Sequence, residues 1–166
     1  MKNLVKLAKE CEADLISIGV QPGVVSLWTV NTRAKKRWGQ CKRDGGGYFV
    51  ISISSRLLTD EVDVQATKNT IMHELIHTVN GCHGHTGLWA EIAAKVNRRL
   101  PQYTIKRTTS CAEKGVEEIA REKTNRYAIR CICCGHEYAR EKMTKVIQYP
   151  ENYRCSYCGG RLERVR

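Results

Sequence analysis

The stretch His73-Glu74-Leu75-Ile76-His77 decides how this chain folds and what chemistry it can carry. Positions four apart lie on the same face of a helix, so His73 and His77 can direct their imidazole nitrogens at one metal ion. Glu74 then lies beside the metal rather than on it, which is where a general base holds an attacking water. The apolar residues around the motif predict a helix with one buried side: Met72, Leu75, Ile76 and Val79. The alternative is a chance occurrence of this spacing on a solvated helix.

A catalytic zinc ion usually takes three protein ligands and leaves the fourth position to water. Residues 78–89, which follow the motif, offer His83 and His85. An asparagine–glycine pair at 80–81 is a turn signal that can end the helix and return the chain toward the metal. His83 has nearly the spacing of the metzincin pattern, although that pattern has glycine where this chain has asparagine. His85 opens a second amphipathic segment, and Glu91 is a third candidate, so ligand chemistry alone leaves the choice open.

The whole segment resembles the SprT-like family of zinc metalloproteases. In that family the same pentapeptide is followed by a glycine-rich turn, a histidine and, four residues later, an aromatic residue. His85 and Trp89 fit this spacing, whereas His83 is an extra histidine that the pattern does not demand. The similarity extends to residues 31–33 and 37–41, which resemble the family's strand pair before the zinc helix. Residues 103–107 and a terminal zinc ribbon resemble the short prokaryotic members.

The resemblance implies an activity and a set of site residues. It implies a small zincin-like domain that hydrolyses peptide bonds, with the catalytic zinc on His73, His77 and His85 and with Glu74 as the base. The family includes Spartan, which is implicated in degrading proteins crosslinked to DNA. The resemblance therefore also implies DNA as a partner, and substrates that are associated with DNA or crosslinked to it.

Length and composition agree with a small metal-binding protein. The 166 residues suffice for one core of ordinary size plus a small appendage. No apolar run approaches the roughly 20 residues of a membrane span, and the charges within residues 1–10 suit an amphipathic helix better than a signal peptide. Nine cysteines, an odd number, without an export signal indicate reduced thiols and metal binding. We therefore expect a cytoplasmic monomer that does not contact membranes.

Four of the cysteines form two pairs with the spacing of zinc knuckles. Cys131-Ile-Cys-Cys134 and Cys155-Ser-Tyr-Cys158 are each followed by a glycine, which lets backbone amides turn toward the thiolates. The separation of the pairs is at the upper end of that in four-cysteine zinc ribbons, and two knuckles complete a closed site of structural character. Cys133 is surplus, and two disulfides in a secreted domain are the alternative. The sequence thus predicts two zinc ions, one catalytic and one structural.

The net charge of +11 is distributed over both halves of the chain, which favours nucleic acid or another polyanion as a partner. The densest cluster of cations surrounds a tryptophan and could hold phosphates and stack on an unpaired base: Arg33, Lys35, Lys36, Arg37, Trp38, Lys42 and Arg43. The alternative is a solvated hairpin face whose charges protect an edge strand, with Trp38 in the core. A second candidate surface lies in the ribbon: Arg126, Arg130, Arg140, Lys142, Lys145, Arg154 and Arg161.

The periodicity and the turn signals predict an α+β fold. Helices are expected near residues 3–18, 62–80 and 86–99. Strands are expected at residues 24–30 and 48–53, with a hairpin loop at 44–47. A short helix and a polar composition are expected between residues 108 and 123.

Three parts of the chain follow from this order. Residues 1–108 are expected to form an SprT-like metalloprotease domain, 109–125 a linker, and 126–166 a β zinc ribbon with four cysteines. The predicted function is a zinc-dependent endopeptidase that acts on DNA-associated or DNA-crosslinked proteins. The alternative is a non-catalytic nucleic-acid-binding zinc protein with a vestigial protease site.

Overall fold

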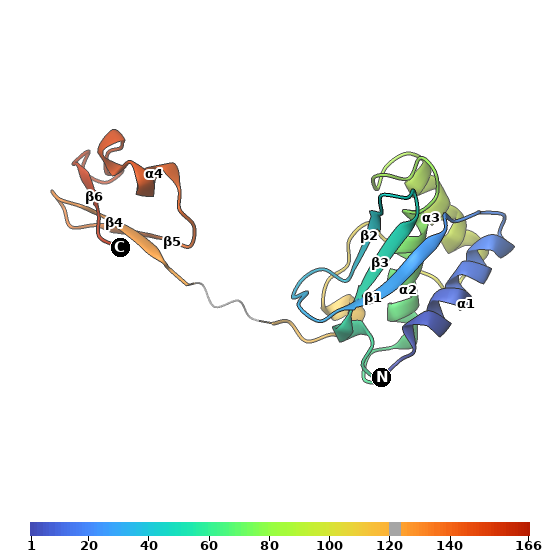
Figure 1. Ribbon diagram of the computed structural model, residues 1–166. Coiled ribbons are helices and arrows are strands. Elements are labelled where there is room, and N and C mark those ends of the chain that lie inside the picture. Colours follow the sequence, from blue (N-terminus) through green and yellow to red (C-terminus); the bar gives the residue numbers. More distant parts are fainter. Residues whose placement is uncertain (120–123) are drawn as a thin grey trace. The chain divides into compact units, whose positions relative to one another are not determined.

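The computed structural model describes residues 1–119 and 124–166. The chain divides into two compact units, Met1–Ile119 and Ala120–Arg166 (Figure 1). Each unit combines short helices with a small sheet of three strands, so the predicted α+β class is confirmed. Among the described residues, no helix combines the length and the apolar composition that crossing a membrane requires.

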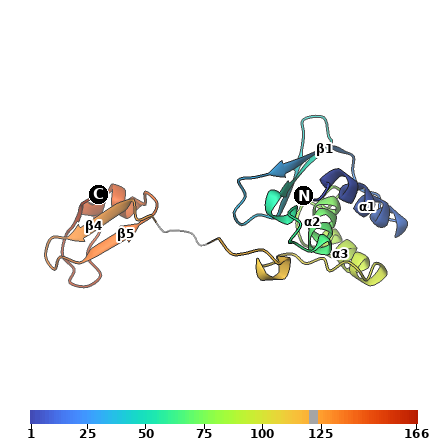
Figure 2. The same ribbon diagram turned by 90° about the horizontal axis from the view of Figure 1, so that it is seen from below.

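The first unit is built on a sheet with the strand order β1-β3-β2. Its strands are β1 (Val25–Asn31), β2 (Gly39–Arg43) and β3 (Phe49–Ser54). The central strand β3 pairs in parallel with β1 and antiparallel with β2, which leaves β2 at one edge. Three helices lie on one side of this sheet, as both views show (Figure 1 and Figure 2): α1 (Leu4–Ser17), α2 (Val64–Ile76) and α3 (Leu88–Arg99).

The core lies between the helices and the sheet, with α2 in contact with both α1 and α3. The first helix begins where the Asn3 side chain accepts a hydrogen bond from the Lys6 amide, a standard N-cap. Alternation along β3 sends Phe49, Ile51 and Ile53 into the core. The expected helix at 3–18 and the expected strands are therefore present within one or two residues of their predicted ends.

The hairpin loop is also present, because Asp44 organises the turn between β2 and β3. Its side chain accepts hydrogen bonds from the Gly46 and Tyr48 amides, and its own amide donates to the Tyr48 carbonyl. Gly47 takes a positive φ of 86° that this turn requires. Strand β2 precedes the turn. Its residues show no clear alternation of apolar and polar side chains, so only the family resemblance predicts this strand.

Helix α2 ends earlier than expected. Its Asp63 cap fits the predicted start, but the α-helix stops at Ile76 instead of continuing to residue 80. The Thr78 hydroxyl donates to the Leu75 carbonyl at 2.6 Å and accepts from the Gly23 amide at 2.9 Å. This side chain tightens the last turn, and Gly81 with φ of 88° redirects the chain.

Residues 109–119 of the predicted linker 109–125 are part of the first compact unit. The Thr109 carbonyl accepts a hydrogen bond from the indole of Trp38 at 3.3 Å. A short 3₁₀ helix, Ala112–Lys114, then places Lys114 against α2. These contacts join residues far apart in sequence, so local composition could not indicate them. The remaining part of the predicted linker, 120–123, lies outside the described residues.

The second unit is a three-stranded antiparallel sheet with the order β5-β4-β6. Its strands are β4 (Tyr127–Cys131), β5 (Glu137–Arg140) and β6 (Leu162–Arg164), and a short helix, α4 (Lys145–Gln148), connects β5 to the later residues. The buried core is small: Ile129, Cys131, Ile147, Cys155 and Leu162. A core of this size rarely stabilises a unit without an additional crosslink or metal ion.

Candidate active site and metal centres

Three imidazole groups meet on one side of α2. His73 lies in the last turn of the helix, His77 is its C-terminal cap, and His85 comes from the loop before α3. The Nε2 atom of His85 lies 2.9 Å from Nε2 of His73 and 3.1 Å from Nε2 of His77. A tetrahedral zinc ion with ordinary Zn–N bonds separates its nitrogen ligands by about 3.3 Å. The residues therefore fit a zinc ion in composition and in spacing.

Backbone carbonyls orient two of these rings. The Nδ1 atom of His73 donates to the Lys106 carbonyl at 3.0 Å, and Nδ1 of His77 donates to the Cys82 carbonyl at 3.1 Å. Because a carbonyl only accepts, each proton is on Nδ1 and each Nε2 keeps a free lone pair for a metal. Burial, followed by the charges of His77 and His85, lowers the pKa of His73 to about 4. The neutral ring is the form that binds zinc.

Trp89 forms the wall behind the three histidines. Its side chain is 3% exposed, and its ring centroid lies 4.8 Å from those of His73 and His85 and 5.5 Å from that of His77. The indole thus restricts how the three imidazoles can rotate. The sequence pattern included an aromatic residue at this position, but only the structure shows this packing role.

The other candidate ligands lie apart from the histidine group. His83 is exposed and lines the rim of the neighbouring cleft, and Glu91 is exposed on α3. Neither belongs to a metal-ligating group within residues 1–119 and 124–166, whereas His73, His77 and His85 form one. The structure therefore brings together the histidine set that the family spacing indicates.

Glu74 is the carboxylate nearest in sequence to these ligands, and it is only 7% exposed. Burial raises the pKa of Glu74 to about 7, while a hydrogen bond from the Cys41 backbone and the charge of Arg37 act in the opposite direction. A carboxyl group with a pKa close to neutral can both accept and release a proton under ordinary conditions. This suits the role of a general base beside a metal site.

The histidines open onto a cleft of about 530 Å³ whose lining is strongly basic. Among the described residues that line it, Glu74 is the one carboxylate, and the cations are Lys36, Arg37, Arg43, Lys106, Arg107 and Lys114. Lys106 is ion-paired with Glu113 at 2.6 Å. Lys114 is buried and donates to the Ala66 carbonyl and to the Thr70 hydroxyl instead of to a carboxylate.

The predicted nucleic-acid residues occupy the segment between β1 and β2 and strand β2 itself. Their cations are all exposed: Arg33, Lys35, Lys36, Arg37, Lys42 and Arg43. Trp38 differs, because it is half-buried and packs against the core. The Arg56 guanidinium also lies 5.3 Å from its ring centroid. Trp38 therefore has a packing role, and the structure supports a charged surface here more than a free stacking ring.

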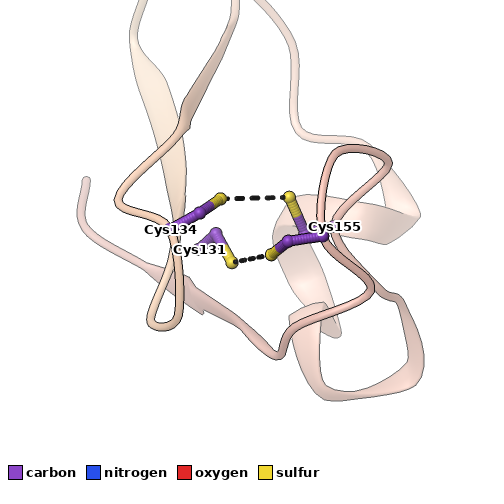
Figure 3. A group of neighbouring side chains, drawn as sticks. Cys131, Cys134 and Cys155 are labelled. Atoms are coloured by element: carbon purple, nitrogen blue, oxygen red, sulfur yellow. Dashed lines mark hydrogen bonds between the residues drawn. The ribbon is translucent and has the colours of Figure 1, made fainter.

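The four paired cysteines of the second unit form another candidate metal centre. Sγ of Cys131 lies 3.4 Å from Sγ of Cys158, and Sγ of Cys134 lies 3.6 Å from Sγ of Cys155 (Figure 3). Zn–S bonds of ordinary length place tetrahedral thiolates about 3.8 Å apart, so this group also fits zinc. The surplus Cys133 is exposed and lies outside the group.

Local hydrogen bonds close the two knuckles and favour the thiolate form of Cys155, whereas the neighbouring thiols raise the pKa of Cys134 and Cys158. Gly135 and Gly159, with φ of 72° and 71°, donate their amides to the carbonyls of Cys131 and Cys155 and close the two knuckles. The Tyr138 hydroxyl lies 3.2 Å from Sγ of Cys155, and this hydrogen bond is the main cause that lowers the pKa of the Cys155 thiol. A lowered pKa favours the thiolate, which is the form that binds metal.

Comparison with known protein families gives a match to the part of the chain that carries the histidine group. The profile of the SprT-like family, a group of zinc metalloprotease-like proteins, matches residues 11–109, which include the histidine group, Glu74 and Trp89. The second unit lies outside the matched residues. The searches of curated proteins and of solved structures gave no match. Because the family profile covers more than half of the chain, the protein belongs to the SprT-like family.

Proposed function

We propose that the protein is a zinc-dependent endopeptidase that acts on DNA-associated or DNA-crosslinked proteins. The observation that carries the proposal is the meeting of three imidazole nitrogens beside a buried carboxylate, in a cleft large enough to admit a peptide. His73, His77 and His85 would hold the zinc ion. This arrangement leaves a position for water, as catalytic zinc sites with three protein ligands do.

The chemistry follows from the groups that flank the ligands. A zinc ion held by the three imidazoles would supply Lewis-acid chemistry of the kind that polarises a carbonyl and activates water. Glu74 accepts the proton of the attacking water and returns it to the amine that leaves. The Cys41 amide and the Arg37 charge favour the ionised form of Glu74, which must be present before the proton is taken. Trp89 and the two carbonyl acceptors keep the imidazoles oriented throughout.

The second zinc ion is proposed to be structural. Cys131, Cys134, Cys155 and Cys158 supply four thiolates, and four thiolates leave no coordination position for water or substrate. The metal would replace the large hydrophobic core that the second unit lacks.

The proposed substrate class rests on charge. Exposed cations between β1 and β2 continue into a basic cleft, and the whole chain carries a net charge of +11. Such a surface attracts phosphates and concentrates proteins that are bound to DNA near the zinc site. The competing function is a nucleic-acid-binding zinc protein with a vestigial protease site. The buried Glu74 argues against it, because a purely structural zinc site gains nothing from a carboxylate whose burial is unfavourable.

The proposal is tested with a purified DNA-binding protein as substrate, either free or on DNA, and internal cleavage is read by mass spectrometry. We expect cleavage that a zinc chelator abolishes, that added zinc restores and that DNA increases. Replacement Glu74→Gln should reduce cleavage by about 10²- to 10⁴-fold with the zinc content unchanged, since it removes a base and not a ligand. Glu91→Gln is the matched control, because Glu91 is exposed and outside the histidine group.

Two outcomes contradict the proposal. Full activity of the Glu74→Gln variant would remove Glu74 from the mechanism. Zinc-loaded wild-type protein that cleaves neither free nor DNA-bound proteins would favour the competing function.

A further inference from the structure

A buried cation lines the cleft one helical turn from the histidine group. The Lys114 ammonium lies against α2, where it donates to the Thr70 hydroxyl at 2.8 Å and to the Ala66 carbonyl at 3.0 Å. Thr70 precedes Glu74 by four residues, so these two side chains are neighbours on one face of α2. The contact with Lys114 is thus displaced along α2 by about 5 Å, the rise of one turn, from the proposed catalytic groups.

The pairing of this ammonium group is incomplete. Its three protons meet two neutral acceptors, and no carboxylate pairs with it among residues 1–119 and 124–166. The adjacent Glu113 is bound to the Lys106 ammonium at 2.6 Å and to the Ser110 amide at 2.8 Å. Lys114 is only 5% exposed, so its charge is desolvated without an anion to compensate it. Attaching the 3₁₀ helix to α2 requires hydrogen-bond donors but no charge, so this attachment does not explain the lysine.

The cleft beside Lys114 offers further donors and little competing negative charge. Asn69 also lines the cleft, and its Oδ1 accepts from the Thr104 amide at 3.0 Å. Within the described ranges, no group accepts a hydrogen bond from the NH₂ of Asn69. Glu74 is the one carboxylate of the described lining, and it already accepts from the Cys41 backbone. Burial lowers the pKa of Lys114 to about 8, which leaves it protonated at neutral pH, so an anion is the ligand that this part of the cleft lacks.

We propose that Lys114 and Asn69 form a subsite for the side-chain carboxylate of an aspartate or glutamate within three residues of the scissile bond. In an extended peptide, side chains on one side recur about every 7 Å, a spacing comparable with the turn of α2 between Thr70 and Glu74. A narrow, flexible side chain can reach an ammonium that is 5% exposed inside a cleft, whereas the backbone of a DNA duplex cannot. The subsite rests on the proposed function, because it requires a peptide that reaches the histidine group.

The test uses the full-length zinc-loaded protein and an internally quenched peptide that contains a cleavage site mapped on a protein substrate. Glutamate is placed in turn at each of the three positions on either side of the scissile bond, and each peptide has a glutamine counterpart. We expect kcat/KM to favour glutamate by about 10- to 100-fold at one position, the range of a hydrogen bond to a charged group. The absence of a preference at every position overturns the inference. An equal preference at all positions also overturns it, because net charge alone would produce that result.

Two variants test whether the preference comes from this subsite. Lys114→Met keeps the shape of the side chain without its charge, and it should abolish the preference for glutamate. Asn69→Asp keeps the acceptor for the Thr104 amide but places a negative charge beside the ammonium, so the preference should also fall. Lys36→Met is the matched control, because Lys36 lines the same cleft as an exposed cation, and it should keep the wild-type preference.

The variants also define the results that contradict the subsite. A wild-type preference in both Lys114→Met and Asn69→Asp overturns the inference, and Asn69→Asp decides the question alone if Lys114→Met does not fold. A loss in Lys36→Met as large as that in Lys114→Met would mean that the charge of the whole cleft sets the preference, which overturns it too.

Binding measurements separate this inference from the proposed function. The Glu74→Gln variant is mixed with labelled peptides that carry one glutamate or one glutamine in a neutral sequence, and fluorescence anisotropy gives their Kd values. Tighter binding of the glutamate peptide that is lost when Lys114→Met is added supports the subsite. If the wild type then cleaves nothing, the peptidase proposal alone is lost, whereas cleavage of proteins without any preference for glutamate loses the inference alone. If Lys114→Met weakens binding of a labelled DNA duplex and leaves peptide binding unchanged, the site takes phosphate and the inference is overturned.

Discussion

Gly39 and Glu74 are in such close contact that no side chain fits between them. A Cβ atom on Gly39 would lie 2.4 Å from Oε1 of Glu74 and 2.7 Å from its Cγ. Two residues farther along β2, the Cys41 backbone donates a hydrogen bond to the same carboxylate. The beginning of β2 therefore provides both the surface on which Glu74 rests and a donor that holds it, so this edge strand positions the proposed base.

Replacement Gly39→Ala should therefore displace Glu74. The carboxylate is buried and cannot swing into solvent at low cost, so we expect it to lose its alignment with the histidine group. A displacement of about 1 Å at a catalytic group can reduce the rate by about 10²-fold, and we expect a loss of this order in kcat. Zinc content should be unchanged, because the ligands lie on other elements.

Gly45→Ala is the control for that prediction, since a Cβ atom at Gly45 in the adjoining turn would meet nothing within 4 Å. Peptide hydrolysis and zinc content are measured for both variants. If Gly39→Ala cleaves as fast as Gly45→Ala, β2 does not position Glu74.

A second prediction concerns the third ligand. His85→Ala should remove the zinc of the first unit, because His85 Nε2 is the atom that both other imidazoles approach. His83→Ala should leave the zinc content intact, because His83 is exposed and outside the group. Metal analysis of the two purified variants distinguishes them. Zinc loss in His83→Ala but not in His85→Ala would assign the ligand to the residue that the metzincin spacing favours.

The sequence predicted those parts of the site that depend on local spacing. His73 and His77 lie one helical turn apart, and this relation follows from helix geometry alone. The position of His85 relative to Trp89 came from the family pattern, and the structure shows a physical reason for it, because the indole packs against all three imidazoles. The two cysteine pairs are local in the same way, since each knuckle is closed by hydrogen bonds within five residues.

The remaining parts of the site depend on contacts that no local pattern contains. The carbonyls of Cys82 and Lys106 orient two of the imidazoles. Every residue has a backbone carbonyl, so the residue types in the sequence do not indicate which carbonyls accept these hydrogen bonds. Lys114 reaches α2 from 44 residues away along the chain, although its surroundings are polar and suggested a linker. The sequence does not distinguish Gly39 from other strand glycines, because its contact with Glu74 exists only where β2 packs against α2.

A third prediction concerns the second unit. Because its core is small, we expect Cys134→Ser to unfold residues 126–166 by removing one of four ligands, while the first unit keeps its fold and its zinc. Cys133→Ser is the matched control, since Cys133 is exposed and outside the metal-ligating group. Limited proteolysis with mass spectrometry shows which residues become accessible. Equal protection of residues 126–166 in both variants would mean that the thiolates do not stabilise this unit.

The last prediction concerns Lys114, whose ammonium group is buried and has no carboxylate partner among residues 1–119 and 124–166. Its side chain is 5% exposed, and burial lowers the pKa of Lys114 from the ordinary 10.5 to about 8, with a small opposing effect of Glu113. Below pH 8 Lys114 is charged in both the folded and the unfolded chain. The buried charge then lowers the free energy of unfolding by its full amount. Between pH 8 and 10.5 the unfolded chain binds more protons than the folded one, so this group makes the fold more stable as the pH rises.

The measurement compares the wild type with Lys114→Met, which has a similar shape and no charge. All three tryptophans (Trp28, Trp38 and Trp89) lie in the first unit, so their fluorescence in urea reports its unfolding. From pH 8 to pH 10 the free energy of unfolding of the wild type should rise relative to that of Lys114→Met by about 2 kcal/mol. Lys9→Met, at an exposed position of α1, should show no such trend. A difference between wild type and Lys114→Met that stays constant over this range would mean that Lys114 keeps an ordinary pKa, and hence that water reaches it through the cleft.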